Sequence, residues 1–169
     1  LMELVEDAMA HGYHTISKDI FIANLNKLNI AAYELNGYKK KIDSIQSYYC
    51  FNLDLLKKEV RDELFGLNND SPIYTKIKDT VPTKYSRTAE VENSFIADGC
   101  KIEGSVKNCI LFRGVHIGRG TSVENCIIMQ DSEIMDNCLL ENVIFDKGVV
   151  LRSGKKLVGQ DTYPMVIGK

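Results

Sequence analysis

The hydrophobic positions in the C-terminal half of the chain recur with a fixed period. The segment VENSFI (residues 91–96) returns as VKNCIL (106–111), VENCII (123–128) and LENVIF (140–145). The copies follow one another at steps of 15, 17 and 17 residues. A fixed period near this length is typical of a solenoid, in which each repeat forms one coil that stacks on the next.

Aligning the copies places large aliphatic residues in three columns, about five or six residues apart within each coil. The columns are Val91, Val106, Val123, Leu140 and Leu157; Ile96, Leu111, Ile128 and Phe145; and Ile102, Ile117, Ile134 and Leu151. A coil with three inward aliphatic residues has three short sides. The pattern therefore predicts a triangular prism of short parallel strands, with a turn at each corner.

Small and turn-forming residues occupy the predicted corners in register. Two columns are Gly99, Gly114, Asp131 and Gly148, and Gly120, Asn137 and Gly154. Glycine, asparagine and aspartate tolerate positive φ, so these columns are typical of a turn that recurs once per coil. We interpret the stacked Asn93, Asn108, Asn125 and Asn142 as turn residues or an amide ladder rather than as ligands.

Cysteines fill small inward positions of the repeat. Cys109 and Cys126 share a column with Ser94 and Val143, and Cys100 and Cys138 occupy similar positions. We interpret these four as small hydrophobic residues rather than as metal ligands or nucleophiles. Cys50 is expected to lie on a helix, with its side chain in the protein core. An odd count of five cysteines without a CxxC pair favours reduced thiols in a cytoplasmic protein.

One column of apolar residues points outward from the predicted prism. Phe95, Ile110, Ile127 and Ile144 directly neighbour inward residues, so strand alternation places them on the outer face. A stripe of four stacked apolar side chains is rarely left in water. The stripe is predicted to be either covered by the N-terminal half of the chain or buried in a subunit interface, and the sequence leaves both open.

The N-terminal residues 1–66 have helical and strand-like patterns. Apolar residues at helical spacing start at Leu1, so the chain is expected to begin inside a helix of a longer protein. Ser17 is a possible cap for a helix through Leu28, and residues 30–35 are strand-like. Ser44 is predicted to cap a third helix that continues to Leu64 and ends at Gly66. Residues 67–87 are predicted to be a linker, with turn chemistry at Asn68–Pro72.

Composition excludes several classes of partner. The chain has 169 residues and a formal net charge of −2, without the basic face that nucleic-acid binding needs. The sequence has neither a signal peptide pattern nor an apolar run of membrane-spanning length. We therefore expect a cytoplasmic protein that binds neither nucleic acid nor membranes.

Individual repeats resemble a known family. IADGCK (96–101) and IGRGTS (117–122) follow the hexapeptide pattern aliphatic-small-x-x-small-x, which resembles the left-handed β-helix family. The left hand comes from this resemblance, since parallel crossovers are generally right-handed. The expected fold is mainly β: a single-stranded left-handed parallel β-helix over residues 88–169, preceded by an α/β region over 1–66.

The N-terminal half narrows the resemblance. Gly37-Tyr38, Ser47-Tyr48 and Asn52-Leu53-Asp54-Leu55-Leu56 resemble the end of the catalytic domain of glucose-1-phosphate adenylyltransferases. The segments 96–100, 112–115 and 163–167 resemble the β-helix of the same family. The resemblance implies that residues 1–66 are the remnant of a nucleotidyltransferase domain.

Departures from the family pattern cluster before the third helix. The family's Trp, Arg and metal-binding Asp positions are Lys39, Lys40 and Lys41, and its Gly-Thr is Asp43-Ser44. A lysine in place of a carboxylate cannot hold Mg²⁺, which the family uses with ATP. This form resembles the GlgD-type subunit of glycogen biosynthesis. We expect no catalytic or metal-binding residues and no cofactor in this chain.

The resemblance implies a regulatory subunit whose β-helix serves assembly and allosteric control. Its partners would be further copies of the chain, as a homo-oligomer, or the catalytic adenylyltransferase subunit, as a hetero-oligomer. Tyr38, Lys39, Lys40 and Lys41 are candidates for binding a sugar phosphate substrate or effector, because consecutive cations suit an anionic ligand.

Other functions stay open at this point. The full-length subunit could be a competent adenylyltransferase. A hexapeptide acyltransferase would use His116, the one histidine in the repeats. A carbonic anhydrase of this fold needs three histidines around zinc, so the single histidine argues against it.

Overall fold

A computed structural model describes residues 2–66, 73–74 and 77–169 of the chain. The chain divides into compact units Leu1–Asn36 and Gly37–Lys169. The predicted turn at Asn68–Pro72 lies outside the described residues. Within the described ranges, no helix is long and apolar enough to cross a membrane.

The first unit contains short helical elements. They are α1 (Met2–Ala10), a π-helical turn η1 (Ile16–Phe21) and a 3₁₀ turn η2 (Ile22–Asn24). The predicted helix from Ser17 to Leu28 is therefore shorter and irregular. The strand-like residues 30–35 have no regular structure, because a strand needs a hydrogen-bonded neighbour and none of the described strands pairs with them.

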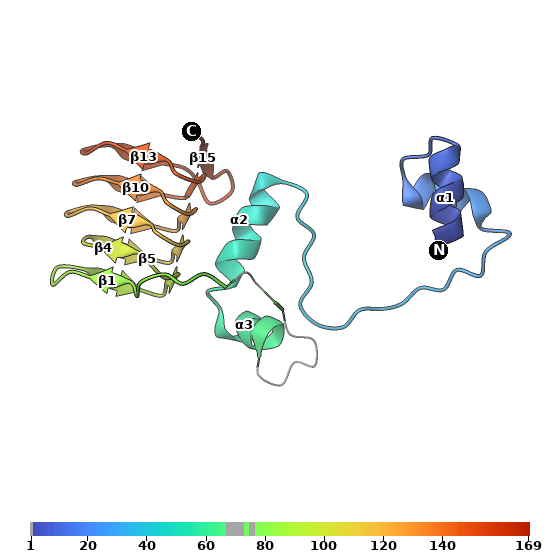
Figure 1. Cartoon of the computed structure of the whole chain (residues 1–169), viewed down its shortest axis with the longest axis horizontal. Helices are drawn as coiled ribbons and strands as arrows, with labels where there is room; N and C mark the ends of the chain where they lie inside the picture. The colour runs from blue at the N-terminus through green and yellow to red at the C-terminus, as the bar shows by residue number, and fades with distance from the viewer. Residues whose placement is uncertain (1, 67–72, 75–76) are drawn as a thin grey trace. The chain divides into compact units, whose positions relative to one another are not determined.

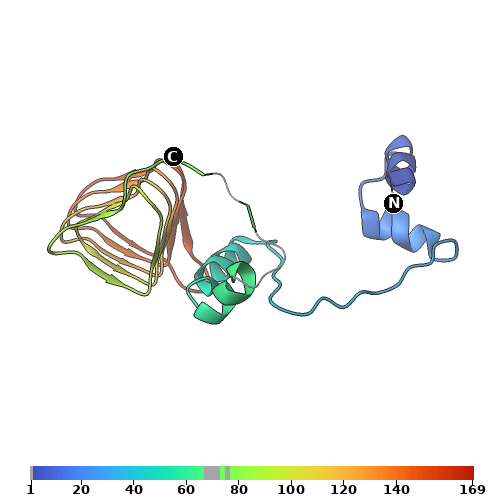
Figure 2. The ribbon, with the colours of Figure 1, turned by 60° about the horizontal axis from the view of Figure 1, so that its bottom comes forward.

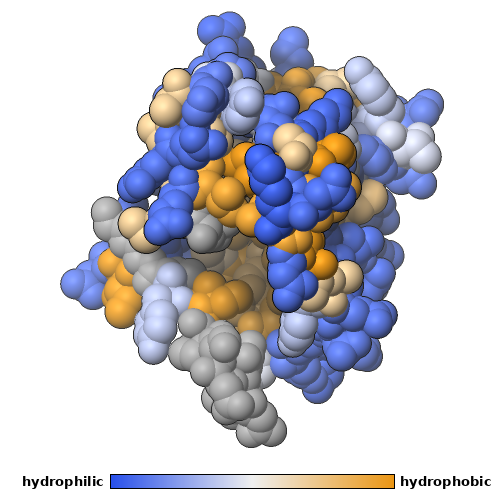
Figure 3. Space-filling model, turned by 90° about the vertical axis from the view of Figure 1, so that its right-hand side faces the viewer, coloured by the Kyte–Doolittle hydropathy of each residue, from blue (hydrophilic) through white to orange (hydrophobic). Residues whose placement is uncertain are grey.

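Large hydrophobic side chains are exposed in this unit, and Ala8 and Ile20 are the buried hydrophobic residues among 2–36. The exposed side chains include Met2, Met9, Ile22, Leu25 and Tyr33. On the face of the molecule shown in Figure 3, patches of hydrophobic surface lie among hydrophilic side chains. A core of this size contributes little stability by itself.

The predicted third helix is divided into α2 (Ile45–Asp54) and α3 (Lys58–Phe65). Ser44 caps α2 as predicted: its hydroxyl accepts from the Ser47 backbone N–H at 3.0 Å. The helix is interrupted at Lys57, because the extended backbone of this residue (φ −79°, ψ 129°) cannot continue a helix. The Arg61 guanidinium donates to the carbonyls of Leu55 and Leu56 at 2.8 and 2.6 Å, which satisfies backbone groups that the break leaves open.

Residues 77–169 form a parallel β-solenoid, consistent with the left-handed β-helix of hexapeptide proteins (Figures 1 and 2). Its described strands make three five-stranded sheets. Sheet A consists of β1 (Lys84–Tyr85), β4 (Lys101–Ile102), β7 (His116–Ile117), β10 (Glu133–Ile134) and β13 (Val150–Leu151). Sheet B consists of β2 (Glu90–Glu92), β5 (Ser105–Lys107), β8 (Ser122–Glu124), β11 (Leu139–Glu141) and β14 (Lys156–Val158). Sheet C consists of β3 (Phe95–Ile96), β6 (Ile110–Leu111), β9 (Ile127–Ile128), β12 (Val143–Phe145) and β15 (Met165–Ile167). Strand β1 lies inside the stretch 67–87 that the sequence suggested as a linker.

The register of the strands confirms the predicted columns. Ile117 pairs with Ile102 and Ile134 in sheet A, and Val123 pairs with Val106 and Leu140 in sheet B. Column residues in the inner coils are buried, with Ile102, Ile117, Ile134 and Ile128 all 0% exposed. The core is therefore a stack of aliphatic layers, one per coil.

Four cysteines lie in this core, as predicted. Cys100, Cys109, Cys126 and Cys138 are buried free thiols. The expectation for Cys50 is wrong, because its side chain is exposed on α2. The residues of α2 that pack toward the solenoid are Tyr48, Tyr49 and Leu53, and Cys50 is not among them.

The corners adopt the predicted left-handed turns. The residues Asn93, Asn108, Asn125, Asn142, Asp131 and Asn137 all have φ between 41° and 59°. Gly114 has φ +71°, and a Cβ there would lie 2.5 Å from the Asp131 carboxylate. Both the conformation and the crowding favour glycine at this corner.

One corner is shorter than the others. Only three residues lie between the inward Ile102 and Val106, whereas five lie between Ile117 and Val123. The chain saves two residues by drawing Gly104 inward, where it is buried. A Cβ on Gly104 would lie 2.7 Å from the Gly118 carbonyl oxygen and would also collide with that of Thr121. This tight corner requires glycine for lack of space.

We expect Ile128→Ala to lower the free energy of unfolding by about 2–5 kcal/mol, because it opens a cavity in a fully buried layer. Urea unfolding followed by circular dichroism measures the change. Val150→Ala is the matched control on an exposed strand position, with an expected change within about 0.5 kcal/mol. Equal effects of the two substitutions would contradict the layered core.

Candidate functional site

Helix α2 lies against the outer face of sheet C (Figures 1 and 2). Tyr49 forms a buried cluster with Ile127 and Ile144, and Tyr48, Leu53, Phe112 and Met129 pack around it. Ile110, Ile127 and Ile144 are 4%, 0% and 4% exposed. Helix α2 thus covers the outward stripe at Ile127 and Ile144, which favours the first of the two predicted alternatives at these positions. Phe95, the fourth residue of the stripe, is 53% exposed and stays an interface candidate.

The hydroxyl of Tyr49 connects α2 to two corner asparagines. It donates to the Asn125 carbonyl oxygen at 2.6 Å and lies 3.1 Å from the Asn142 Oδ1. The Asn142 amide nitrogen in turn donates to the Gly159 carbonyl at 3.3 Å. Burial raises the pKa of the Tyr49 phenol, so the hydroxyl stays protonated and remains a donor.

The asparagine column is part turn and part amide ladder. All four residues have positive φ, as the turn interpretation requires. The Asn93 amide donates to the Asn108 Oδ1 at 2.7 Å, which is one rung of a ladder. At the other end, the buried Asn142 accepts from Tyr49. The column therefore also serves as a docking point for α2.

The segment before α2 contains the predicted ligand-binding residues, and it folds back along the helix. The Tyr38 backbone N–H donates to the Glu63 carboxylate of α3, and the Tyr38 hydroxyl donates to Asp54 Oδ2 at 2.9 Å. The Tyr38 ring lies 6.1 Å from that of Phe51, centroid to centroid. Burial and the hydrogen bond to Asp54 raise the pKa of Tyr38 to about 12. Tyr38 is thus held at the C-terminal end of α2.

The structure separates the three lysines. Lys40 Nζ lies 3.8 Å from Asp54 Oδ2, next to Tyr38, whereas Lys41 Nζ lies 3.4 Å from Asp43 Oδ2. Lys39, Lys40 and Lys41 are all exposed, so their ammonium groups are accessible to an anion. Burial opposes ionisation of Asp54, but hydrogen bonds from Lys57 and Tyr38 lower its pKa. Tyr38 and Lys40 therefore converge on one carboxylate, and Lys41 does not.

The residues near Lys41 do not fit a magnesium site. An ammonium group stands where the family pattern has a ligating carboxylate, and it pairs with Asp43. Among the described residues, no group of three His, Cys, Asp or Glu side chains has a metal-binding arrangement.

Beside this segment lies an apolar groove of about 500 Å³, at the start of α2. Its lining is Ile42, Asp43, Ser44, Ile45, Tyr48, Met129, Ile144 and Val166. Most of this lining is apolar, and Asp43 and Ser44 are its polar residues.

His116 belongs to a charged network on sheet A. Its Nε2 lies 3.1 Å from Glu103 Oε2 and its Nδ1 lies 3.4 Å from Glu133 Oε1. Glu103 also pairs with Lys101 at 3.0 Å and with Arg119 at 3.5 Å. Hydrogen bonds from Lys101 and His116 lower the pKa of Glu103 to about 2. Because both ring nitrogens face carboxylates of the same sheet, His116 is poorly placed to act as a base on a substrate.

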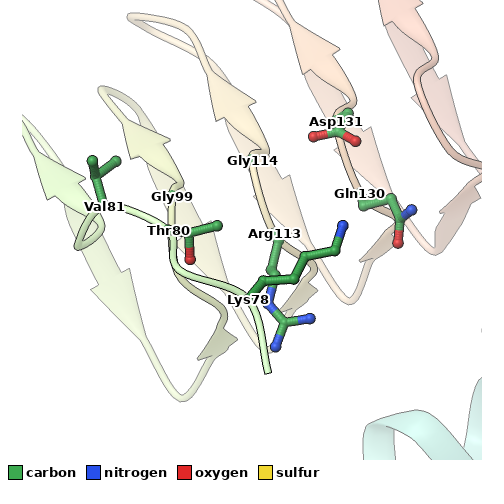
Figure 4. A pocket seen from close by; sticks show the side chains of 8 residues that line it. All are labelled: Lys78, Thr80, Val81, Gly99, Arg113, Gly114, Gln130 and Asp131. Carbon is green, nitrogen blue, oxygen red and sulfur yellow. The ribbon is translucent and has the colours of Figure 1, made fainter. Parts of the chain in front are cut away.

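A cavity of about 560 Å³ lies at the corner between sheets C and A (Figure 4). Its lining is Lys78, Thr80, Val81, Gly99, Arg113, Gly114, Gln130 and Asp131. The cations of Lys78 and Arg113 face the same space as the Asp131 carboxylate, so the cavity has mixed charge.

Tyr49 and Glu103 were not singled out from the sequence. Asn142 was predicted as a turn residue or part of an amide ladder, and its contact with a helix was not predicted. The paired Tyr48-Tyr49 was the available signal, since a buried tyrosine needs a partner for its hydroxyl.

Comparison with known proteins agrees with this architecture. The sequence profile of the family described as GlmU-like, C-terminal hexapeptide matches residues 78–163, just over half of the chain. A glycogen biosynthesis protein GlgD of Bacillus subtilis is 41% identical over 169 residues, covering 100% of this chain and 48% of that protein. A GlgD protein of Geobacillus stearothermophilus is 43% identical over 123 residues, covering 73% and 35%. A glucose-1-phosphate adenylyltransferase of Bacillus cytotoxicus is 34% identical over 127 residues, covering 75% and 33%. The chain thus spans between a third and a half of the length of these relatives.

We expect Glu103→Gln to lower stability in a pH-dependent way. The carboxyl of Glu103 has a folded pKa of about 2, below its ordinary 4.5, so the ionised form is favoured by folding. Its contribution is complete above about pH 4.5 and is lost as the pH falls toward about 2. Thermal midpoints from about pH 2.5 to about pH 6 should therefore show a deficit that shrinks on acidification. Glu90→Gln, at an exposed position of β2, is the control. A deficit independent of pH would contradict the network.

Proposed function

The chain belongs to the family of GlmU-like, C-terminal hexapeptide proteins, and from this membership we propose that it is the C-terminal part of a glucose-1-phosphate adenylyltransferase subunit of glycogen biosynthesis. The relatives named GlgD and glucose-1-phosphate adenylyltransferase support the assignment. We propose further that the subunit is of the non-catalytic, regulatory GlgD type and acts in the cytoplasm.

A single observation carries the non-catalytic assignment. The resemblance to adenylyltransferases places Lys41 at the family's metal-binding aspartate, and its ammonium is exposed and paired with Asp43 at 3.4 Å. A cation here repels the metal that would neutralise the phosphates of ATP. The same cation, with Lys39 and Lys40, suits the phosphate of a sugar phosphate bound as an effector.

The open first coil of the solenoid supports a role in assembly. Tyr85 and Val91 belong to inward columns but are 52% and 42% exposed, and the neighbouring Phe95 is 53% exposed. In the inner coils the equivalent column positions are nearly inaccessible. An apolar end of a solenoid needs a cap or a partner, so this end fits a contact with a further copy or with the catalytic subunit.

An acyltransferase using His116 has less support. His116 lies between Glu103 and Glu133, and these hydrogen bonds occupy the nitrogens that such a mechanism would need. An active adenylyltransferase remains the main alternative, and an activity assay decides between the two.

We expect the full-length subunit alone to form ADP-glucose at least about a hundredfold more slowly than the catalytic subunit, because it lacks the metal-binding carboxylate. The assay contains ATP, Mg²⁺ and glucose 1-phosphate. Lys41→Asp tests whether this position limits turnover, and Lys58→Asp on exposed α3 is the control. Turnover by the lone wild-type subunit near that of the catalytic subunit would overturn the non-catalytic assignment.

We expect Phe95→Asp in the full-length subunit to raise the dissociation constant of the oligomer at least about tenfold, because it places an unpaired charge at an apolar contact. Analytical ultracentrifugation with and without the catalytic subunit measures this. Val150→Asp adds the same charge at an equally exposed position of sheet A, away from the first coil, and should leave assembly unchanged. Unaltered assembly of the Phe95 variant would argue against this end as the contact.

A further inference from the structure

Helix α2 connects the ligand-binding segment to the solenoid. Tyr38 is fixed at its C-terminal end by the bond to Asp54, and Ser44 caps its N-terminus, so residues 38–43 run back along its length. It packs on sheet C through Tyr49, Ile127 and Ile144, and the Gln46 side-chain amide donates to the Asp161 carbonyl oxygen at 2.9 Å. Any shift of α2 on the solenoid therefore moves the lysine segment as well.

Apolar packing alone does not specify where α2 sits. Its docking surface is a stripe of similar residues, Ile110, Ile127 and Ile144, repeated once per coil. Coils in a parallel sheet are spaced by about 4.8 Å, so a shift of α2 by one coil would meet nearly the same apolar surface. Hydrophobic contacts are non-directional and discriminate weakly between such positions.

Directional hydrogen bonds reduce this ambiguity. The Tyr49 hydroxyl reaches the Asn125 carbonyl and the Asn142 Oδ1 together, at 2.6 and 3.1 Å. One coil higher this pair of acceptors does not exist, because Gly159 stands in the place of Asn142 and has no side-chain oxygen. Leaving the partly buried Asn125 carbonyl without a donor also has an energetic cost.

We propose that Tyr49 is a positioning residue for the segment Tyr38–Lys41, and that it acts by fixing the register of α2 on the corner asparagines Asn125 and Asn142. The identity of the ligand as a sugar phosphate rests on the proposed function, whereas the positioning of the segment does not. The aromatic ring of Tyr49 packs on Ile127 and Ile144, and its hydroxyl favours one register of α2 over the others.

The test uses Tyr49→Phe in the full-length protein, which keeps the ring and removes the hydroxyl. Cleavage by endoproteinase Lys-C at Lys39–Lys41 under native conditions reports how often the segment leaves α2. Loss of a buried hydrogen bond should speed this cleavage about five- to tenfold. Tyr163→Phe, at an 82% exposed tyrosine, is the matched control and should leave the rate unchanged.

A second measurement separates positioning from general destabilisation. Cleavage at solenoid lysines such as Lys101 and Lys107, and the thermal midpoint of the solenoid, should not change in Tyr49→Phe. Asn142→Gly removes the other partner but keeps the positive φ of this turn, 52°. Combining it with Tyr49→Phe should accelerate cleavage by less than the product of the single effects. Unchanged cleavage in Tyr49→Phe, or equal acceleration at all lysines, would overturn the proposal.

Titration with glucose 1-phosphate then tests the ligand. We expect Tyr49→Phe to weaken binding about fivefold, in proportion to the looser segment. Replacing Lys39, Lys40 and Lys41 together by alanine should abolish it. If the wild type does not bind glucose 1-phosphate, the proposed ligand is wrong, while the cleavage rates still decide the role of Tyr49.

Discussion

The hydrogen bonds between successive coils hold the rest of this structure in place. Each strand is only two or three residues long and cannot persist alone, so it depends on parallel partners above and below. Those bonds fix which residues stack, and stacking decides what is buried. Ile117 lies between Ile102 and Ile134 because the backbone ladder places it there. The aliphatic layers, the thiols and the corner turns all follow from this register.

A strict repeat makes this part of the molecule readable from sequence. Periodic aliphatic residues identify the three sheets, and in-register glycine, asparagine and aspartate identify the corners, because each coil faces the same physical demand. Cys109 and Cys126 were predictable for the same reason. The assignment of the fold rests on several copies of the repeat, so a wrong prediction at one residue does not change it.

The regions without a repeat were harder to predict. The break at Lys57 depends on Arg61 reaching back to the Leu55 and Leu56 carbonyls, a contact that helical spacing does not encode. The strand-like residues 30–35 have β propensity but no described strand partner. The exposure of Cys50 and the burial of Tyr49 follow from how α2 docks on sheet C. The network around Glu103 joins residues from three coils, and no single repeat reveals it.

The hydrogen bonds that position α2 interrupt the translational symmetry of the solenoid. Tyr49 distinguishes one coil from the next for α2, although the surface beneath it is nearly uniform. Such a contact allows a repetitive solenoid to hold a helix such as α2 at a defined position along its axis.

The shortened corner at Gly104 has a similar effect on the opposite side of the prism. By omitting two residues, the chain shortens one corner, and Glu103 beside it pairs with Arg119 and His116 of the following coil. In a solenoid of identical coils every coil would present the same surface, whereas here one coil differs from the rest. The short corner therefore makes one coil different from the others, so positions along the solenoid are not equivalent.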